Sequence, residues 1–157
     1  MQMDMKRILF FIMLMLTSTV MFAKTPIEEL VERYQDVKGV KNIVAHGAMM
    51  SIARPMLKSY TIGPLADCVD ELSSLRIQRG ISDTDKKRFV SDLDKILKKY
   101  IYAGKTKSTS GIVDVYVHLE STDYADELVV YNPETHVLNV LRGRFPVAEL
   151  AKLKCEV

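Results

Sequence analysis

Apolar residues change from a helical to a strand spacing shortly after residue 100. Over 89–100 they recur at the three- and four-residue intervals of one helix face, and Ser82 or Asp83 can cap this helix. Over 113–119 every second residue is apolar and the residues between are mostly polar. This alternation is typical of a strand with one polar face. We therefore predict a long helix over 82–100 and a strand over 113–119.

Shorter helices and strands are expected on both sides of this change. Thr25, Pro26 and Glu28 form a helix start with a capping box, and the helix is expected to stop before Gly39. The other predicted helices cover 47–57, with a disturbance at Pro55, 64–72 and 146–151. The other predicted strands cover 40–45, 75–79, 101–107, 128–131 and 137–141.

This order of elements is typical of an α+β fold. We expect a single antiparallel or mixed sheet, with helices packed mainly on one face and a C-terminal strand meander. The sequence contains no internal repeat and no linker, so residues 24–157 are expected to form a single domain.

Residues 1–23 have the pattern of a secretory signal peptide. Lys6 and Arg7 precede an apolar run over 8–16, and Ala23 is the small residue before the expected cleavage site. That run is much shorter than the roughly 20 apolar residues that cross a bilayer. We therefore predict an exported, soluble protein, periplasmic or secreted after cleavage near Ala23, with no transmembrane segment in the mature chain.

Cys68 and Cys155 are the only cysteines, so an oxidising compartment allows one pairing. Cys68 lies on an apolar stripe with Leu65, Val69 and Leu72, where a free cysteine packs as a small hydrophobic residue. The pattern favours a packed thiol and leaves the disulfide as the alternative.

Composition and motifs argue against several classes of function. A net charge of +2 gives no strongly basic character, so we expect no nucleic-acid partner. The sequence has no nucleophile elbow, no glycine-rich phosphate loop and no metal-binding HExxH or CxxC spacing. Asp126 and Glu127 are adjacent in sequence, which predicts side chains facing different ways and not an acid–base pair. We expect no cofactor and no enzymatic activity, with an uncharacterised hydrolase as the alternative.

Two groups of residues are candidates for binding. Arg142 and Arg144 are expected at the end of the last strand, where guanidinium groups hold anionic ligands or discourage edge pairing. Tyr116, His118 and Glu120 are expected on the polar face of one strand. His118 and Glu120 could approach a cation together with His136, although a solvated strand face has the same pattern.

All the methionines of residues 24–157 lie in one short segment. Met49, Met50 and Met56 could form an adaptable partner-binding surface or fill the core. Because apolar side chains are most often buried, we expect core packing.

The chain resembles a family of small exported proteins of Bacteroidetes-type bacteria that is catalogued as a domain of unknown function. The resemblance covers roughly 30–153 and is carried by an ordered set of segments: 32–34, 37–40, 48–50, 89–100, 129–134, 141–143 and 147–153. It implies an envelope protein with a signal peptide and an α+β domain, and it supplies no catalytic residues. Many members carry a lipobox cysteine, which this chain lacks.

From these patterns we expect an exported, non-catalytic interaction module that binds an unknown envelope protein or component. The alternative is a small-ligand or metal-binding periplasmic protein that uses His118 and Glu120 on the polar sheet face.

Overall fold

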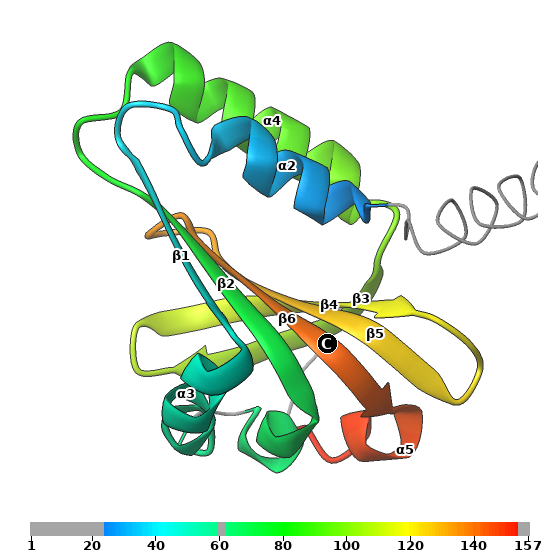
Figure 1. The fold of residues 1–157 in the computed structure, drawn as a ribbon. Coiled ribbons are helices and arrows are strands. Elements are labelled where there is room, and N and C mark those ends of the chain that lie inside the picture. Colours follow the sequence, from blue (N-terminus) through cyan, green and yellow to red (C-terminus); the bar gives the residue numbers. More distant parts are fainter. Residues whose placement is uncertain (1–23, 60–61, 154–157) are drawn as a thin grey trace, which may run out of the picture.

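Six strands form one twisted antiparallel sheet in this computed structural model, which describes residues 24–59 and 62–153 (Figure 1). Their order across the sheet is β1-β2-β6-β5-β4-β3. The last four strands along the chain form a meander, so the predicted α+β fold is confirmed. The strands are β1 (Val40–His46), β2 (Val69–Ile77), β3 (Ile101–Ser108), β4 (Gly111–Leu119), β5 (Tyr124–Asn132) and β6 (Val137–Pro146).

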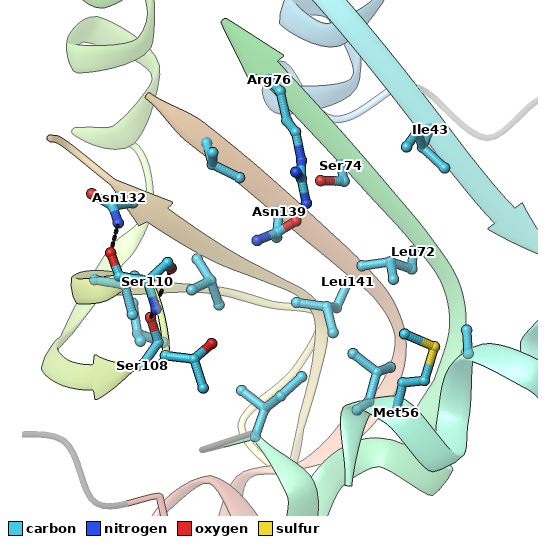
Figure 2. A pocket seen from close by; sticks show the side chains of 18 of the residues that line it. Ile43, Met56, Leu72, Ser74, Arg76, Ser108, Ser110, Asn132, Asn139 and Leu141 are labelled. Atoms are coloured by element: carbon cyan, nitrogen blue, oxygen red, sulfur yellow. Dashed lines mark hydrogen bonds between the residues drawn. The ribbon is translucent and has the colours of Figure 1, made fainter. Parts of the chain in front are cut away.

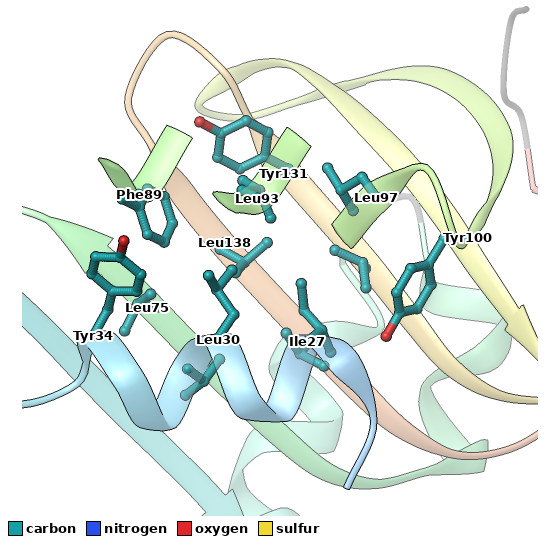
Figure 3. Close-up of a cluster of buried hydrophobic side chains, with 13 residues drawn as sticks. Ile27, Leu30, Tyr34, Leu75, Phe89, Leu93, Leu97, Tyr100, Tyr131 and Leu138 are labelled. Atoms are coloured by element: carbon teal, nitrogen blue, oxygen red, sulfur yellow. The ribbon is translucent and has the colours of Figure 1, made fainter. Parts of the chain in front are cut away.

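Two long helices, α2 (Pro26–Tyr34) and α4 (Asp83–Leu97), lie side by side over one face of the sheet (Figure 1). Helix α2 begins at its predicted cap and α4 at Ser82, one of its two predicted caps. The Thr25 and Ser82 hydroxyls accept hydrogen bonds from backbone N–H groups of the first turn. Their apolar faces bury a core against the sheet, in which the Tyr34 and Phe89 rings meet edge to face at 5.2 Å (Figure 3). Sheet residues complete it, among them Leu75 and Leu138.

Short helices gather at the other end of the sheet and form a second core. They are η1 (Gly47–Met49), α3 (Met50–Leu57), η2 (Gly63–Cys68) and α5 (Val147–Leu150). Met50, Leu65 and Phe145 are buried there with Val69 and Leu128. Pro55 lies inside α3, where the sequence predicted a disturbance.

The predicted helix over 64–72 is wrong in its second half. A 3-10 helix ends at Cys68 and strand β2 begins at Val69, well before the predicted strand start at residue 75. Strand β2 pairs with β1 on one side and β6 on the other, so its backbone groups find partners that a local pattern cannot reveal. The helical spacing of Leu65, Val69 and Leu72 was therefore misleading.

The predicted signal peptide (1–23), residues 60–61 and Cys155 lie outside the described residues. Among the helices that the structure does describe, none has the length and apolar character needed to cross a bilayer.

Candidate functional site

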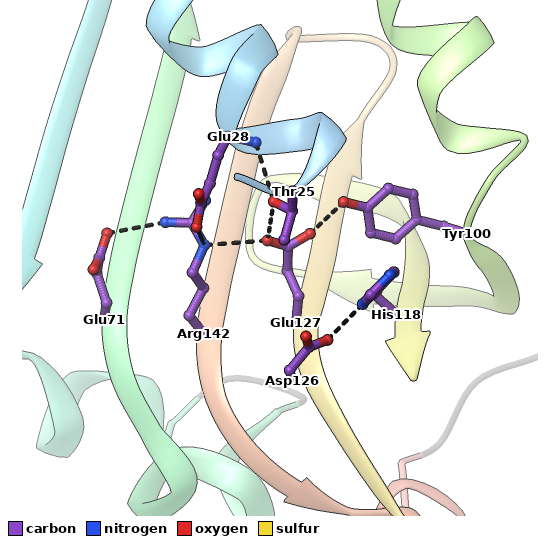
Figure 4. A network of polar contacts seen from close by, with 8 residues as sticks. All are labelled: Thr25, Glu28, Glu71, Tyr100, His118, Asp126, Glu127 and Arg142. Carbon is purple, nitrogen blue, oxygen red and sulfur yellow. Dashed lines mark hydrogen bonds and ion pairs between the residues drawn. The ribbon is translucent and has the colours of Figure 1, made fainter. Parts of the chain in front are cut away.

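Arg142 lies at the centre of a polar network beneath the first turn of α2 (Figure 4). Its Nε is 2.6 Å from a Glu28 carboxylate oxygen and 3.1 Å from one of Glu127, and its Nη1 is 3.0 Å from Glu71. The guanidinium thus faces three carboxylates on three different elements. Arg142 is engaged by the protein's own acidic side chains, and its role in this network is to join α2, β2, β5 and β6.

Glu127 is the buried member of this network, with only 1% of its side chain exposed. It accepts a 2.8 Å hydrogen bond from the Thr25 hydroxyl and a short one from the Tyr100 hydroxyl, besides the contact with Arg142. Burial raises the pKa of Tyr100 far above its usual range, and the hydrogen bond to Glu127 adds to this effect. Three donors therefore satisfy a carboxylate that would otherwise be costly to bury.

The expectation that Asp126 and Glu127 face different ways is wrong. The strand register shifts between Ala125 and Glu127, so one extra residue interrupts the alternation of β5. Figure 4 shows both carboxylates on the α2 side of the sheet, Glu127 at Arg142 and Asp126 at His118. An irregularity in pairing, which sequence spacing does not reveal, brings them to one face.

Arg144 has different surroundings from Arg142, although the two share a strand. Its guanidinium carbon lies 3.9 Å from the centre of the Tyr124 ring, an exposed cation–π contact. Gly143 lies between the two arginines, and a Cβ atom at this position would lie 1.9 Å from the Cys68 carbonyl oxygen. The glycine is required because the end of η2 passes directly over β6 at this point. The arginine pair and its central glycine thus have three separate roles.

The Nδ1 atom of His118 lies 2.6 Å from the Oδ1 atom of Asp126, and each side chain is about one-third exposed. Its ring packs against Tyr100 at a centroid distance of 5.5 Å. Glu120 does not share its strand face, because β4 ends at Leu119 and Glu120 lies exposed in the following bend. Of the predicted polar group, only His118 therefore lies against other polar side chains of this region.

The remaining members of that group lie elsewhere. The Tyr116 ring packs against Tyr102 at 5.2 Å, beside the core under α4. His136 lies in the turn before β6, where its Nδ1 is 2.9 Å from the Tyr131 hydroxyl and burial lowers its pKa. Across the described ranges, no three His, Cys, Asp or Glu residues are grouped closely enough to hold a metal ion.

The expectation that the methionines fill the core is right for Met50 alone, which is 1% exposed. Met49 and Met56 are 57% and 62% exposed, and Ile52 between them is 71% exposed. Spacings of three and four residues place the three exposed side chains on one side of η1 and α3. They form an exposed apolar ridge, which consists of Met49, Ile52 and Met56.

A groove with a volume of about 670 Å³ runs over the sheet face opposite α2 and α4 (Figure 2). Leu72 and Ser74 of β2 point into it. Leu75 points to the opposite face of the sheet and belongs to the first core, under α2 and α4. Helix α3 borders it through Ala53, Met56 and Leu57. The other aliphatic lining comes from four strands and the segment before η2: Ile43, Ala45, Ile62, Val113, Val115, Val130, Val137 and Leu141.

One end of this groove is polar. Arg76, Ser74 and Asn139 lie together there on β2 and β6, and Figure 2 shows the Arg76 side chain reaching towards the other two. Asn132 lines the same region and donates a 3.1 Å hydrogen bond to the Ser110 carbonyl. Arg76 is the one charged side chain among the described residues that line the groove.

Sequence reasoning missed this groove and its arginine. The predicted helix over 64–72 concealed the alternation of Leu72, Ser74 and Arg76 along β2. A strand assignment from residue 69 would have placed these three side chains on one face of the sheet, and Ser73 and Leu75 on the other face.

Cys68 is partly buried at the end of η2, where it packs against the second core, although the helical stripe from which its burial was predicted does not form. Burial raises the pKa of its thiol, and the neighbouring Asp67 carboxylate raises it further. This environment favours an inert thiol over a reactive thiolate. The predicted pairing with Cys155 remains a prediction, because Cys155 lies outside the described residues.

Compared with models of protein families, with curated proteins and with solved structures, the chain matches none. The resemblance to a family of exported proteins therefore stays a prediction.

Proposed function

We propose that this chain is a non-catalytic binding protein that holds an elongated, largely aliphatic ligand in the groove on the open sheet face. The observation that carries this proposal is the groove itself, a hollow of about 670 Å³ with aliphatic side chains on most of its wall. Ligand pockets commonly have volumes of roughly 300–1,000 Å³ and predominantly apolar walls. Covering exposed aliphatic surface is favourable by about 25 cal/mol per Å².

The lining also supports binding without catalysis. Ser108, Thr109 and Ser110 supply hydroxyls, but no histidine or carboxylate lies among the described lining residues to activate them. The His118 and Asp126 pair lines neither this groove nor the shallow hollow on α4. A substrate in the groove would therefore meet no general base from the described lining.

A neighbouring pair of substitutions tests the groove. Ala45 lines it, whereas Val44 precedes Ala45 on β1 and points to the opposite face. Ala45→Phe is expected to fill the groove and abolish binding of the neutral fluorophore N-phenylnaphthylamine, measured by its fluorescence increase. Val44→Phe adds the same ring outside the groove and is expected to leave binding unchanged. Absence of fluorophore binding to the unmodified protein would refute the proposal.

A second candidate function is docking of an envelope protein on the ridge of Met49, Ile52 and Met56. The exposure of three large apolar side chains on one side of a short helical segment favours it. Mild crosslinking in the native envelope fraction tests it. Ile52→Glu is expected to remove a reproducible partner that Ala45→Phe retains. Loss of that partner in Ala45→Phe, with retention in Ile52→Glu, would assign the interaction to the groove instead.

The compartment in this proposal is the cell envelope, supported by the signal-peptide pattern over 1–23. Mass spectrometry of the protein from its native source is expected to give a chain that starts at Lys24. A full-length chain in the cytoplasmic fraction would contradict export.

A further inference from the structure

One cation, Arg76, lines the polar end of the groove, and a second lies beside it on the neighbouring strand. Lys41 of β1 lies directly opposite Arg76 of β2 in the strand register. The alternation of β1 places Lys41 on the same face as Ile43 and Ala45, which line the groove. Directly opposite residues of an antiparallel pair have Cβ atoms roughly 5 Å apart, so the two charged side chains share one patch of surface.

These two cations have no partner among the described residues. Neither side chain makes a hydrogen bond or ion pair with another described residue, and both are exposed. Glu134, in the turn between β5 and β6, forms no ion pair with either of them. Like charges directly opposite each other on a sheet destabilise it. An anion between Lys41 and Arg76 would remove this repulsion.

The polar groups next to Arg76 suit an oxyanion. Ser74 lies two residues before Arg76 on the same face, and Asn139 lies directly opposite Ser74 on β6. A guanidinium, a hydroxyl and a side-chain amide thus offer hydrogen-bond donors at one place (Figure 2). Arginine binds carboxylate and phosphate through two parallel hydrogen bonds, which gives direction as well as charge.

The lining becomes apolar along β2 and β6 in the same direction. On β2, Leu72 lies two residues further from Arg76 than Ser74 does. On β6, Leu141 lies two residues after Asn139 and directly opposite Leu72. The distance along β2 from Arg76 to Leu72 is about 13 Å at the rise of an extended strand. Beyond these leucines, Met56 and other side chains of α3 border the groove. The polarity of the groove therefore has a direction, from a cationic end to an aliphatic end.

We propose that the groove binds a single acyl chain with an anionic head, the head held at Lys41 and Arg76 and the chain lying on Leu72, Leu141 and Met56. This inference rests on the proposed function, because it names the ligand class of the same groove. The head is a carboxylate or a phosphate, and the donors at Arg76 suit both.

Three probes with the same chain test the head. Dodecanoate and dodecyltrimethylammonium below their micelle concentrations, and dodecanol below its solubility limit, are used to displace N-phenylnaphthylamine from the full chain. Dodecanoate is expected to bind about tenfold more tightly than dodecanol, because charge-assisted hydrogen bonds form to its head. Dodecyltrimethylammonium is expected to bind more weakly than either. Dodecyl phosphate in a fourth titration distinguishes a lipid phosphate from a free carboxylate as the preferred head.

Substitutions at the two cations separate the head from the chain. Arg76→Gln and Lys41→Gln are each expected to reduce the affinity for dodecanoate towards that of dodecanol, and to leave dodecanol affinity unchanged. Lys87→Gln removes one exposed positive charge from α4 and is the control, with no expected effect on either ligand. Raising the salt concentration is expected to weaken dodecanoate binding and not dodecanol binding.

The failures of the two proposals are distinguishable. Equal affinity for dodecanoate and dodecanol, or an unchanged preference in both Gln variants, would overturn the anionic head and leave a groove for apolar ligands. Binding of none of the probes would overturn the groove as a ligand site. Urea midpoints of Arg76→Gln and Lys41→Gln that match the unmodified protein show that lost affinity reflects the head contact and not unfolding.

Discussion

Replacing Arg142 with alanine is expected to destabilise the protein far more than replacing Arg144, two residues further along the same strand. Arg142 is 21% exposed and contacts three carboxylates within 3.1 Å. One of them, Glu127, is 1% exposed and would lose the cation that compensates its charge. Arg144, by contrast, is exposed and makes a single cation–π contact with Tyr124.

The free-energy difference follows from burial. Removing one partner of a buried ion pair costs about 3–5 kcal/mol, because an uncompensated charge remains. Thr25 and Tyr100 still donate to Glu127 after the change, so the lower end of this range is expected. An exposed cation–π contact contributes about 0.5–1 kcal/mol. The expected gap between the two variants is therefore at least about 2 kcal/mol on these figures.

Urea unfolding, followed by far-ultraviolet circular dichroism, measures this gap. With a dependence of about 2 kcal/mol per M of urea, Arg142→Ala is expected to lower the midpoint by about 1.5 M and Arg144→Ala by less than about 0.5 M. Equal midpoints for the two variants would refute the network as a source of stability. A large effect of Arg144→Ala alone would show that the assignment of roles is reversed.

Two further variants test close packing and a charged hydrogen bond. Gly143→Ala is expected to destabilise by more than about 3 kcal/mol, since its methyl group would overlap the Cys68 carbonyl, and a urea midpoint near that of the unmodified protein would contradict this. The pKa of Asp92 is lowered by a 2.7 Å hydrogen bond that its carboxylate accepts from the Tyr34 hydroxyl, and by the neighbouring Arg33. Its carboxylate therefore stabilises the fold above the unfolded carboxyl pKa of about 3.9, and this stabilisation is lost as pH falls through the lower folded pKa. Asp92→Asn is expected to cost about 1 kcal/mol at pH near 7, and the gap between the urea midpoints of the two proteins is expected to shrink below pH of about 4. A gap that stays constant with pH would argue against the charge as its source.

Local patterns predicted the elements whose apolar spacing is long and regular. The helix from Asp83 and the strand ending at Leu119 were found because each repeats one period over many residues. The segment from Leu65 to Leu72 was too short for its period to be decisive. Pairing of β2 with two neighbouring strands settled its conformation.

The candidate site was less predictable than the fold. Arg142 and Arg144 look equivalent in sequence, yet one is held by three carboxylates and the other packs on a tyrosine ring. Asp126 and Glu127 share a face because the pairing of β5 is irregular there. Lys41 and Arg76 are far apart in sequence and meet only through strand register.

The sequence by itself determined the secondary-structure class, the helix start at Thr25, and the alternation of buried and less buried residues along β4. These depend on hydrogen bonds and spacings within a few residues, which a chain carries wherever it folds. The tertiary structure alone decided which polar residues are paired, which methionines are exposed, and where a groove lies with a cation at one end. Those properties depend on strand order, register and close approach, and they arise only when distant segments pack together.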